Sequence, residues 1–491
     1  MFDYFLTQIV KLSFDVIFAL ILIYNIVAVI VIVFYEKRKP TTALAWLMVL
    51  FFLPVLGFLL YLFVGRHIFR EKIFKEKTIN DALIRTIIEG QINEITGLTQ
   101  YPPGFEKLQR FHKIIIMLLN EDHAHVSIHN EIEVYTNGNE KFKSFLAAIE
   151  SAERYIHIEY YIIRNDELGR KVIDALTRKA KEGLEVRLLA DAVGVNSLPK
   201  NFFNELKKAG GYVEIFFPLW VPFINLRLNH RNHRKFLIID GKIGFIGGFN
   251  IGDEYLGKGP LGYWRDTHFK ITGIAVHSLQ LRFIMDWNYA SKNKLDLNDF
   301  YFQDIEKKGN VALQIVSSGP DAPQMSIRDL YLCLIHEARE SVYIETPYFV
   351  PDEPISEALR TAAQSGIDVR IIIPCKPDHP FVYWSSYSYL GELLPFGVKG
   401  YTYEKGFIHS KTIVVDGLVG SVGTANWDIR SFKLNFETNA SFGDENLGAK
   451  MKNIFLLDLK ECKELTLERY EGRNFIIKVK EGIARLLSNL Q

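Results

Sequence analysis

The sequence predicts an α/β protein of two similar halves, each a β-sheet flanked by helices, preceded by an N-terminal transmembrane helical hairpin. Three observations support this fold class. Two long apolar segments occupy the first 65 residues, alternating helix and strand patterns fill the rest, and one set of motifs occurs twice. At 491 residues the chain is also too long for one ordinary domain, so several units are expected.

The two apolar segments predict a transmembrane hairpin at residues 1–65. Val16 to Phe34 comprises 19 residues with Asn25 as its one strongly polar member, and Ala43 to Val64 comprises 22. Each is long enough, as a helix, to cross a hydrocarbon core of about 30 Å. A second apolar segment follows the first directly, which argues against a cleaved signal peptide. Pro54 is expected to kink the second helix, and it leaves a re-entrant segment as the alternative to a full crossing.

The basic residues around these segments predict their orientation in the membrane. Lys11 precedes the first segment, residues 37–39 place three basic side chains between the two, and five more follow between Arg66 and Lys77. With two crossings, six basic residues lie on the side of the termini and three on the other side. Because cytoplasmic loops carry the excess of lysine and arginine, both termini are expected in the cytoplasm.

The chain after residue 130 contains an internal duplication. AIESAERYIHIEYYI at 148–162 is similar to LIHEARESVYIETPYF at 334–349, and aligns Glu159 with Glu345. DALTRKAKEGLEVRLLAD and EALRTAAQSGIDVRIII then repeat a helix, a glycine stop and a β-branched strand. This order is typical of a sheet covered by helices, and two such units are expected to pack as a pseudo-twofold pair.

These patterns predict five regions of the chain. They are the hairpin at 1–65, a helical connector at 66–130, a first α/β half at 131–310, a second at 311–443, and a helical C-terminal segment at 444–491.

A motif of charged and polar residues also occurs once in each half. HRKFLIID begins at His233 and leads to GGFN, and HSKTIVVD begins at His409 and leads to GTAN; each histidine precedes its asparagine by 17 residues. The candidate site residues are His233, Lys235, Asp240 and Asn250 in the first copy, and His409, Lys411, Asp416, Thr424 and Asn426 in the second. On a strand, residues two apart share a face, so each histidine and its lysine are expected to enter one pocket.

The two aspartates of the motif also have a structural interpretation. Asp240 and Asp416 complete the two copies, and we count them with the catalytic candidates. Each stands at the end of a predicted strand before a glycine, however, and this position is typical of a turn.

The chemistry that suits these residues is transfer of a phosphoryl group. A histidine near neutral pH can be a nucleophile or a general acid, and a neighbouring lysine supplies positive charge. Two lysines and two asparagines around one phosphate could stabilise a five-coordinate transition state without a metal. One histidine would form a phosphohistidine, while the other would protonate the leaving alcohol and then deprotonate the acceptor.

Each histidine also needs a carboxylate to fix its tautomer. Asp266 follows His233 by 33 residues, and Glu437 follows His409 by 28. The similar separations indicate related, histidine-orienting roles.

The repeated motif resembles the signature of the phospholipase D superfamily, HxKx₄D followed by glycine, a small residue and asparagine. The stretches GGFNIGDEYLG, YWRDTHFKITG, ETPYFVPDEP and GTANWDIRSFKLNFE are similar to bacterial cardiolipin synthases of the two-span type. The N-terminal RKPTTALAWLMVLFFLPVLGFLLYLFVG is similar to the membrane segment of that group. The resemblance covers nearly the whole chain.

This resemblance implies that two phosphatidylglycerol molecules are joined into cardiolipin with release of glycerol, with no nucleotide, cofactor or metal. It implies a multi-pass protein of the bacterial inner membrane whose partners are phosphatidylglycerol and the bilayer; the oligomeric state stays open. Superfamily relatives often use the first histidine as nucleophile, which favours His233. One departure is Gly248, where many members carry serine, so that a hydroxyl beside the phosphate would come from Thr424 alone.

Other functions remain to be weighed against this one. A membrane-bound phospholipase D that hydrolyses headgroups would carry the same motifs, because the acceptor decides between the two. A nuclease is disfavoured by 58 basic against 57 acidic residues, a net charge of +1. A non-catalytic scaffold is disfavoured because both histidines, lysines and orienting carboxylates are present. Three widely spaced cysteines fit neither a disulfide framework nor a zinc site.

Three further stretches could contact lipid. FFPLWVPF at 216–223 and FVYWSSYSYL at 381–390 could line acyl chains, although ordinary core packing explains them equally well. FIIKVKEGIARLLSNL at 475–490 has helical apolar spacing with basic residues interleaved. We expect this helix to dock against the domain, with a helix lying on the bilayer as the alternative.

Overall fold

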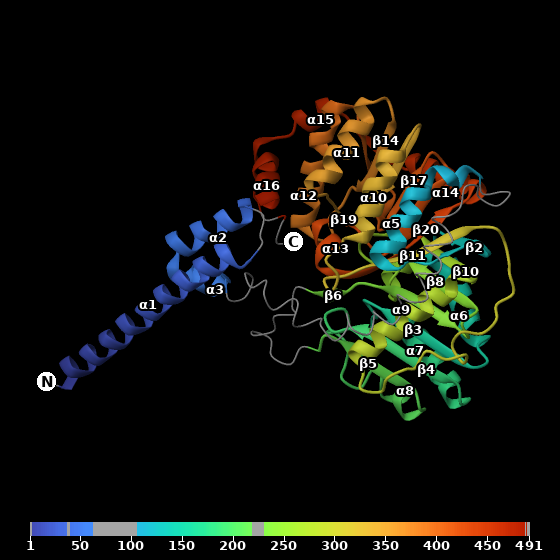
Figure 1. Ribbon diagram of the computed structural model, residues 1–491, viewed down its shortest axis with the longest axis horizontal. Helices are drawn as coiled ribbons and strands as arrows, with labels where there is room; N and C mark the ends of the chain where they lie inside the picture. The colour runs from blue at the N-terminus through green and yellow to red at the C-terminus, as the bar shows by residue number, and fades with distance from the viewer. Residues whose placement is uncertain (1, 37–39, 62–105, 219–229, 487, 489–491) are drawn as a thin grey trace. The chain divides into compact units, whose positions relative to one another are not determined.

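A computed structural model describes residues 2–36, 40–61, 106–218, 230–486 and 488 (Figure 1). The chain divides into two units, one formed by Met1–Glu76 with Leu219–Leu228 and the other by Lys77–Pro218 with Asn229–Gln491. Each unit is described by itself.

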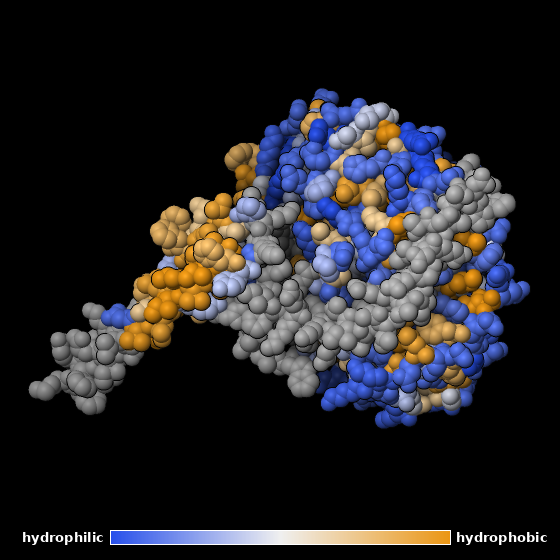
Figure 2. All heavy atoms as spheres, in the orientation of Figure 1, coloured by the Kyte–Doolittle hydropathy of each residue, from blue (hydrophilic) through white to orange (hydrophobic). Residues whose placement is uncertain are grey.

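The N-terminal unit contains α1 (Phe2–Phe34), α2 (Pro40–Phe52) and α3 (Pro54–Leu60). Within α1, Asp15–Phe34 is the one helix of the described chain that is long and apolar enough to cross a membrane. Figure 2 shows its hydrophobic surface. The first predicted span is therefore present as a single helix.

The second apolar segment differs from the prediction of one spanning helix. The helix breaks at Leu53, because Pro54 has no N–H to donate and begins α3. The ring of Tyr61 at the end of α3 lies 5.5 Å from that of Trp46 in α2. In one straight helix those residues would stand about 22 Å apart, so α3 folds back on α2. The 13 residues of α2 extend only about 20 Å, less than a hydrocarbon core.

This reversal is held by close contacts. A Cβ on Gly57 would come within 2.6 Å of the Val49 carbonyl oxygen, so only glycine permits the approach of α3 to α2. Asn25 of α1 donates from Nδ2 to the carbonyl oxygen of Pro54 at 2.9 Å, beside the break. This hydrogen bond ties α1 to the start of α3.

The larger unit contains both predicted α/β halves. In the first half a seven-stranded sheet has the order β2-β10-β8-β7-β3-β4-β5. Its strands are β2 (Asn130–Tyr135), β10 (His268–Gly273), β8 (Ile243–Gly247), β7 (Lys235–Ile239), β3 (Tyr155–Tyr160), β4 (Glu185–Asp191) and β5 (Tyr212–Phe216). The helices are α6 (Gly138–Glu150), α7 (Glu167–Lys181), α8 (Asn204–Lys208) and α9 (Ala275–Ala290).

The second half repeats this arrangement in a larger sheet, whose order is β1-β11-β20-β18-β17-β12-β14-β15-β21. The strands are β1 (Val126–Ser127), β11 (Ala312–Ser318), β20 (Asn435–Gly443), β18 (Val419–Gly423), β17 (Thr412–Val415), β12 (Ser341–Glu345), β14 (Asp368–Pro374), β15 (Lys399–Tyr403) and β21 (Cys462–Leu465). The helices are α5 (His112–Asp122), α10 (Ser326–Glu337), α11 (Glu353–Gln364), α12 (Pro380–Leu393), α13 (Ile429–Lys433), α14 (Glu445–Leu459), α15 (Leu467–Glu471) and α16 (Phe475–Leu486).

The shared strand order confirms the duplication. From β2 to β5, and from β11 to β15, equivalent strands follow in the same sequence across each sheet. The helices before β4 and β14 end as predicted, because Gly183 and Gly366 take φ values of +92° and +91°. Glu159 in β3 and Glu345 in β12 occupy equivalent central strands.

Two strands lie outside the halves that the sequence delimits. β1 comes from the predicted connector, and β21 comes from the C-terminal segment that was expected to be helical. Both pair antiparallel with strands of the second sheet, β1 with β11 and β21 with β15. The sheet of the second half is therefore completed by one strand that precedes the first half and one strand from the C-terminal segment.

Two short parallel strand pairs join the halves. β6 (Arg231–Asn232) of the first half pairs with Asn435 and Phe436 of β20 in the second. β16 (Gly406–Ile408) of the second half pairs with β9 (Tyr263–Arg265) of the first. A motif histidine directly follows β6 and another directly follows β16, so these two strand pairs position the histidines at the boundary between the halves. A third pair joins β13 (Phe349–Val350) to β19 (Trp427–Asp428) within the second half.

Candidate active site

The two motif histidines enter one buried region at the boundary of the halves. His233 follows β6 directly and donates its backbone N–H to the Phe436 oxygen at 2.9 Å. His409 follows β16 and donates its N–H to the Arg265 oxygen at 2.7 Å. His233 and His409 are only 9% and 7% exposed, so solvent reaches each ring through a small area.

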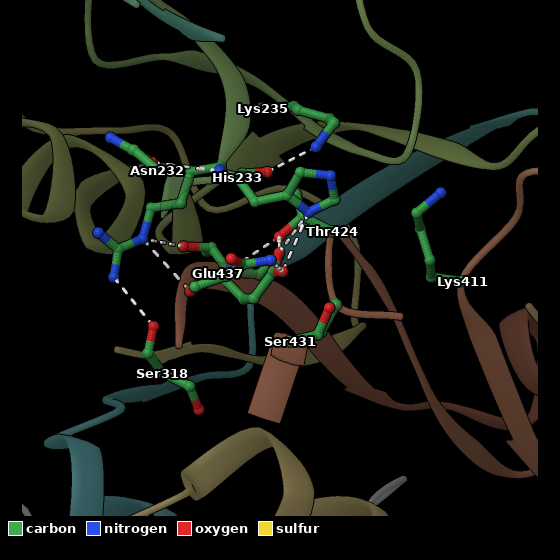
Figure 3. A network of polar contacts seen from close by, with 12 residues as sticks. Asn232, His233, Lys235, Ser318, Lys411, Thr424, Ser431 and Glu437 are labelled. Carbon is green, nitrogen blue, oxygen red and sulfur yellow. Dashed lines mark hydrogen bonds and ion pairs between the residues drawn. The ribbon is translucent and has the colours of Figure 1, made fainter. Parts of the chain in front are cut away.

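This backbone arrangement pairs each histidine with the carboxylate of the other half, and Figure 3 shows the pair of His233 and Glu437. Nδ1 of His233 lies 2.9 and 3.0 Å from the two oxygens of Glu437, which follows Phe436. Nδ1 of His409 lies 2.6 Å from Oδ2 of Asp266, which follows Arg265. Each carboxylate follows one motif in the sequence but contacts the histidine of the other motif. The reason is that the strand pairs β6–β20 and β9–β16 bring each histidine beside a strand of the opposite half.

The lysines lie on the same side of their strands as the histidines. Nζ of Lys235 donates to the His233 carbonyl oxygen at 2.6 Å, and Nζ of Lys411 donates to that of His409. Both lysines are fully buried. Each lysine therefore lies beside the histidine of its own motif, as the strand periodicity predicts.

Burial controls the protonation of these groups. It lowers the pKa of both His233 and His409 to about 4, although the partner carboxylates act in the opposite direction. Burial likewise lowers the pKa of Lys411 to about 8 and that of Lys235 well below its usual range. At neutral pH both imidazoles are thus neutral in the free enzyme, and this is the form that can attack phosphorus.

Glu437 is held by more donors than the histidine alone. Thr424 donates its hydroxyl to Glu437 Oε2 at 2.6 Å, and Asn435 donates from Nδ2 to Oε1 at 3.1 Å. Burial would raise the pKa of Glu437, but His233, Lys235 and Thr424 together bring it below its usual value. An ionised Glu437 accepts the Nδ1–H of His233 and leaves Nε2 with its lone pair.

Thr424 therefore supports Glu437, whereas the sequence suggested that its hydroxyl would face substrate phosphate. The equivalent position in the first half is Gly248, and a Cβ there would lie 2.0 Å from Oδ1 of Asp266. A serine at this position does not fit beside Asp266 as placed. The departure from the superfamily pattern has a steric cause.

The two asparagines differ in their contacts. Asn250 accepts from the Ile162 N–H at 3.3 Å and donates to the Tyr255 hydroxyl at 2.6 Å. Asn426 is buried, and its Oδ1 has no hydrogen-bond partner in the described part of the chain. Asn426 consequently keeps an acceptor for a ligand hydroxyl.

The carboxylates of the two motif aspartates accept backbone hydrogen bonds at the strand ends remote from the histidines. Asp240 accepts the backbone N–H groups of residues 153–155 at 2.8–2.9 Å, and Asp416 accepts those of residues 339–341 at 2.8–3.3 Å. Both have positive φ, +52° and +54°. Each fixes the start of a central strand, β3 or β12, and neither contacts a histidine in these interactions. Their placement fits the turn interpretation.

Several residues around the site were not predicted. Aromatic rings flank the imidazoles, with Tyr161 4.8 Å from His233 and Trp264 5.4 Å from His409 between ring centres. Arg234, between the motif histidine and lysine, donates to the Glu437 carbonyl oxygen at 3.2 Å and to Thr438 Oγ1 at 2.8 Å. The alternation of the strand indicates that Arg234 faces away from His233, but not that it supports the opposite half.

The described residues include no cluster of three or more histidine, cysteine, aspartate or glutamate side chains arranged to hold a metal ion.

Comparison with known proteins places these features in context. The family model "Cardiolipin synthase, PLD-like domain" matches residues 145–258 and 331–459, and "Phospholipase_D-nuclease N-terminal" matches residues 23–66. The major cardiolipin synthase ClsA of Bacillus subtilis is 47% identical over 476 residues, which cover 96% of this chain and 98% of that protein. A cardiolipin synthase of Staphylococcus aureus is 46% identical over 468 residues, 95% of this chain and 94% of that protein.

Among solved structures, phosphatidylserine synthase of Haemophilus influenzae has a similar fold. Its TM-score is 0.59 at 16% identity, and the likeness covers 76% of this chain and 96% of that one.

Proposed function

The chain belongs to the cardiolipin synthase family of phospholipase D-like proteins, and we propose that it transfers a phosphatidyl group between two phosphatidylglycerol molecules. The products would be cardiolipin and glycerol. One observation carries the proposal: two histidines, each beside a lysine and each paired with a carboxylate of the opposite half, share one buried site. Exchange of two alcohols at one phosphorus requires a nucleophile that holds the phosphatidyl group and a second group that carries the proton, and the two histidines can supply these roles.

In the first step, Nε2 of His233 attacks the phosphorus of the first phosphatidylglycerol. An N–P bond forms, the P–O bond to the headgroup glycerol breaks, and His409 gives its proton to the departing oxygen. Glu437 supports the attack by accepting the Nδ1–H of His233. The charges of Lys235 and Lys411 stabilise the phosphoryl oxygens in the transition state.

In the second step, a headgroup hydroxyl of another phosphatidylglycerol replaces glycerol. His409, now neutral, takes the proton of that hydroxyl while its oxygen attacks phosphorus, and the N–P bond breaks. The buried Asn426 Oδ1, which has no partner among the described residues, supplies an acceptor for a glycerol hydroxyl. Cardiolipin leaves, and both histidines return to their starting state.

The low pKa of the two histidines bears on the first step. With a pKa of about 4, His409 is neutral in the free enzyme at neutral pH and has no proton to give. A bound phosphodiester carries a negative charge beside both rings, and an opposite charge favours the protonated imidazole. Substrate binding is therefore expected to bring the catalytic proton onto His409.

The test gives the detergent-solubilised protein phosphatidylglycerol alone and follows cardiolipin, phosphatidic acid and glycerol together. Cardiolipin with an equal amount of glycerol supports transfer between lipids. Phosphatidic acid with glycerol, and no cardiolipin, would mean that water is the acceptor and that the protein is a hydrolase.

We further propose that the protein crosses the membrane once. The fold-back of α3 on α2 supports this topology, because a segment that reverses enters and leaves on one side. The side of the catalytic unit would then hold eight basic residues, and the N-terminal side would hold Lys11 alone. The eight are Lys37, Arg38, Lys39, Arg66, Arg70, Lys72, Lys75 and Lys77. This bias is stronger than the six against three of two crossings, and it keeps the catalytic unit in the cytoplasm.

Reporter fusions at the two ends distinguish these topologies. Alkaline phosphatase, which is active only outside the cytoplasm, should be active at the N-terminus and inactive at the C-terminus. Inactivity at both ends would restore the two-crossing topology.

A further inference from the structure

Helix α16 exposes a continuous apolar face on the catalytic unit. Phe475, Ile476, Val479, Ile483 and Leu486 are 79%, 63%, 41%, 50% and 83% exposed. At about 100° per residue these five side chains fall within an arc of about 100° on one side of the helix. Figure 2 shows hydrophobic side chains at this place.

The opposite side of α16 is fixed to the domain. Glu481 and Ala484 are buried, and Arg473 makes an ion pair with Glu481 at 2.7 Å. Arg485 pairs with Glu392 of α12 and lies over the ring of Tyr389 at 4.7 Å. The exposed apolar face therefore belongs to a helix that is docked on the domain, and its exposure does not result from fraying of the chain end.

The distribution of charge around this face fits an anionic lipid surface. Lys478 and Lys480 lie on opposite borders of the apolar arc, about 60° and 40° beyond its edges at 100° per residue. Long basic side chains beside an apolar stripe can bury their stems and keep their charges at the level of lipid headgroups. Phe381, 58% exposed near the start of α12, adds apolar surface on the helix that carries α16.

The surface is also connected to the catalytic residues. Asp378, just before α12, accepts from the Tyr348 hydroxyl, and its negative charge acts on Lys411. Ser386 within α12 accepts the backbone N–H of Phe349 at 2.9 Å, and the strand of Phe349 pairs with β19, next to Asn426. The helix that holds α16 therefore begins beside the site and packs on its supporting strands.

We propose that the apolar face of α16 lies in the headgroup region of the bilayer and holds the active site at the lipid surface. The inference rests on the proposed function, because a lipid substrate must pass from the bilayer into a buried site. Membrane helix α1 in the same chain keeps the catalytic unit close to a bilayer. A helix that lies in the membrane interface would also fix the orientation of the catalytic unit relative to the bilayer.

The direct test measures lipid contact and needs no activity. A fluorophore on Ile483→Cys, in the full-length chain reconstituted into phosphatidylglycerol vesicles, should be quenched by lipids with a nitroxide near the headgroup. The same label on Leu457→Cys of α14, an equally exposed position (59%), is the matched control and should be quenched much less. Labelling the unsubstituted chain gives the contribution of its three native cysteines.

Two results would overturn the proposal. Equal quenching at 483 and 457 would mean no specific lipid contact. A position 483 that is shielded from lipid, and whose signal changes with protein concentration, would make α16 an interface between copies of the chain.

A kinetic test asks whether the contact serves the site. The triple variant Ile476→Ser, Val479→Ser, Ile483→Ser should raise the KM for phosphatidylglycerol in vesicles by about tenfold, which corresponds to about 1.4 kcal/mol, and leave kcat unchanged. In detergent micelles it should match the unsubstituted chain, because lipid there reaches the site from any direction. Equal loss in micelles and vesicles, with an unchanged melting temperature, would contradict the orienting role. Absence of cardiolipin from every variant, including the unsubstituted chain, would instead contradict the proposed function.

Discussion

At the scale of single residues, the two halves position their histidine-orienting carboxylates in different ways. Glu437 is long, and a threonine hydroxyl at 424 supports it. Asp266 is shorter, and it occupies the space that a side chain at 248 would need. Each histidine of the duplicated site therefore contacts a carboxylate, but a side chain at the position after the motif glycine supports only one of the two carboxylates, Glu437.

We expect Gly248→Ala to lower kcat by at least about tenfold, since one lost charge-assisted hydrogen bond at a catalytic imidazole costs about 1.5–3 kcal/mol. The new Cβ would displace Asp266 from His409. Gly482→Ala, assayed with it in detergent micelles where the proposed lipid contact of α16 is not needed, is the matched control, because no atom lies within 4 Å of a Cβ there. Steady-state kinetics on both variants, with melting temperatures, make the comparison. Unchanged kcat in Gly248→Ala would show that Asp266 does not need its present position.

The pKa directions predict the pH dependence of kcat/KM in the free enzyme. Between about pH 5 and 8 the free enzyme has two neutral imidazoles and a charged Lys411, whereas the reacting complex carries one more proton, on His409. Because that proton must be taken up from solution, kcat/KM should fall about tenfold per pH unit across this range. Activity should also fall in acid, where protonation of His233 removes the nucleophile, and the decline should become steeper above about pH 8, where Lys411 loses its charge; this steeper part is the alkaline limb. The variant Lys411→Arg should lose the alkaline limb, because its guanidinium stays charged. If the variant keeps the alkaline limb, the loss of activity there is due to the titration of another group.

At the scale of secondary-structure elements, the motif aspartates fix the ends of strands. Asp240 and Asp416 sit in the left-handed region and each gathers backbone N–H groups at the start of a central strand. Aspartate tolerates this conformation better than most residues and its charge strengthens each hydrogen bond. Strands β3 and β12 are thereby held in register beside the histidine strands β7 and β17.

We expect Asp416→Ala to lower the free energy of unfolding by about 2–3 kcal/mol, because several N–H groups lose a charged acceptor. Activity per folded molecule at low temperature should stay within several-fold of normal. The folded-state pKa of Asp416 is lowered, so its contribution is present at neutral pH and disappears as pH falls through that pKa. Melting temperatures across pH should therefore converge for the variant and the unsubstituted chain in acid. Lost activity with unchanged stability would instead support a catalytic role.

At the scale of the whole molecule, neither half contains a complete catalytic pair. The histidine of one half depends on the carboxylate of the other, and both pairings occur within a single chain. A pseudo-twofold arrangement thus combines two incomplete motifs into one site with two carboxylate-paired histidines.

His233→Ala and His409→Ala should each reduce cardiolipin formation by more than about a thousandfold without changing the melting temperature, because both roles are needed for turnover. Mixing the two inactive variants should restore nothing, since each chain then lacks one histidine of its own site. Cardiolipin assays on each variant and on the mixture test this. Recovered activity in the mixture would mean that halves are exchanged between copies.

The sequence alone determined the duplication, the α/β class and the residues of the motif. Local periodicity shows which side chains share a strand face, and this is why the sequence places His233 with Lys235, and His409 with Lys411. Spacing also located Asp266 and Glu437, since both follow a motif at similar distance.

Only the tertiary structure decided which partners meet. The exchange of Asp266 and Glu437 between halves depends on the parallel pairs β6–β20 and β9–β16, whose partners lie about 200 and 140 residues apart. The fold-back at Pro54 and the exclusion of a side chain at Gly248 likewise depend on groups from elsewhere in the chain, namely the backbone of α2 at Gly57 and the carboxylate of Asp266 at Gly248. Sequence periodicity reports the local conformation of a segment, whereas these contacts are set by long-range strand register and close packing, which no local pattern encodes.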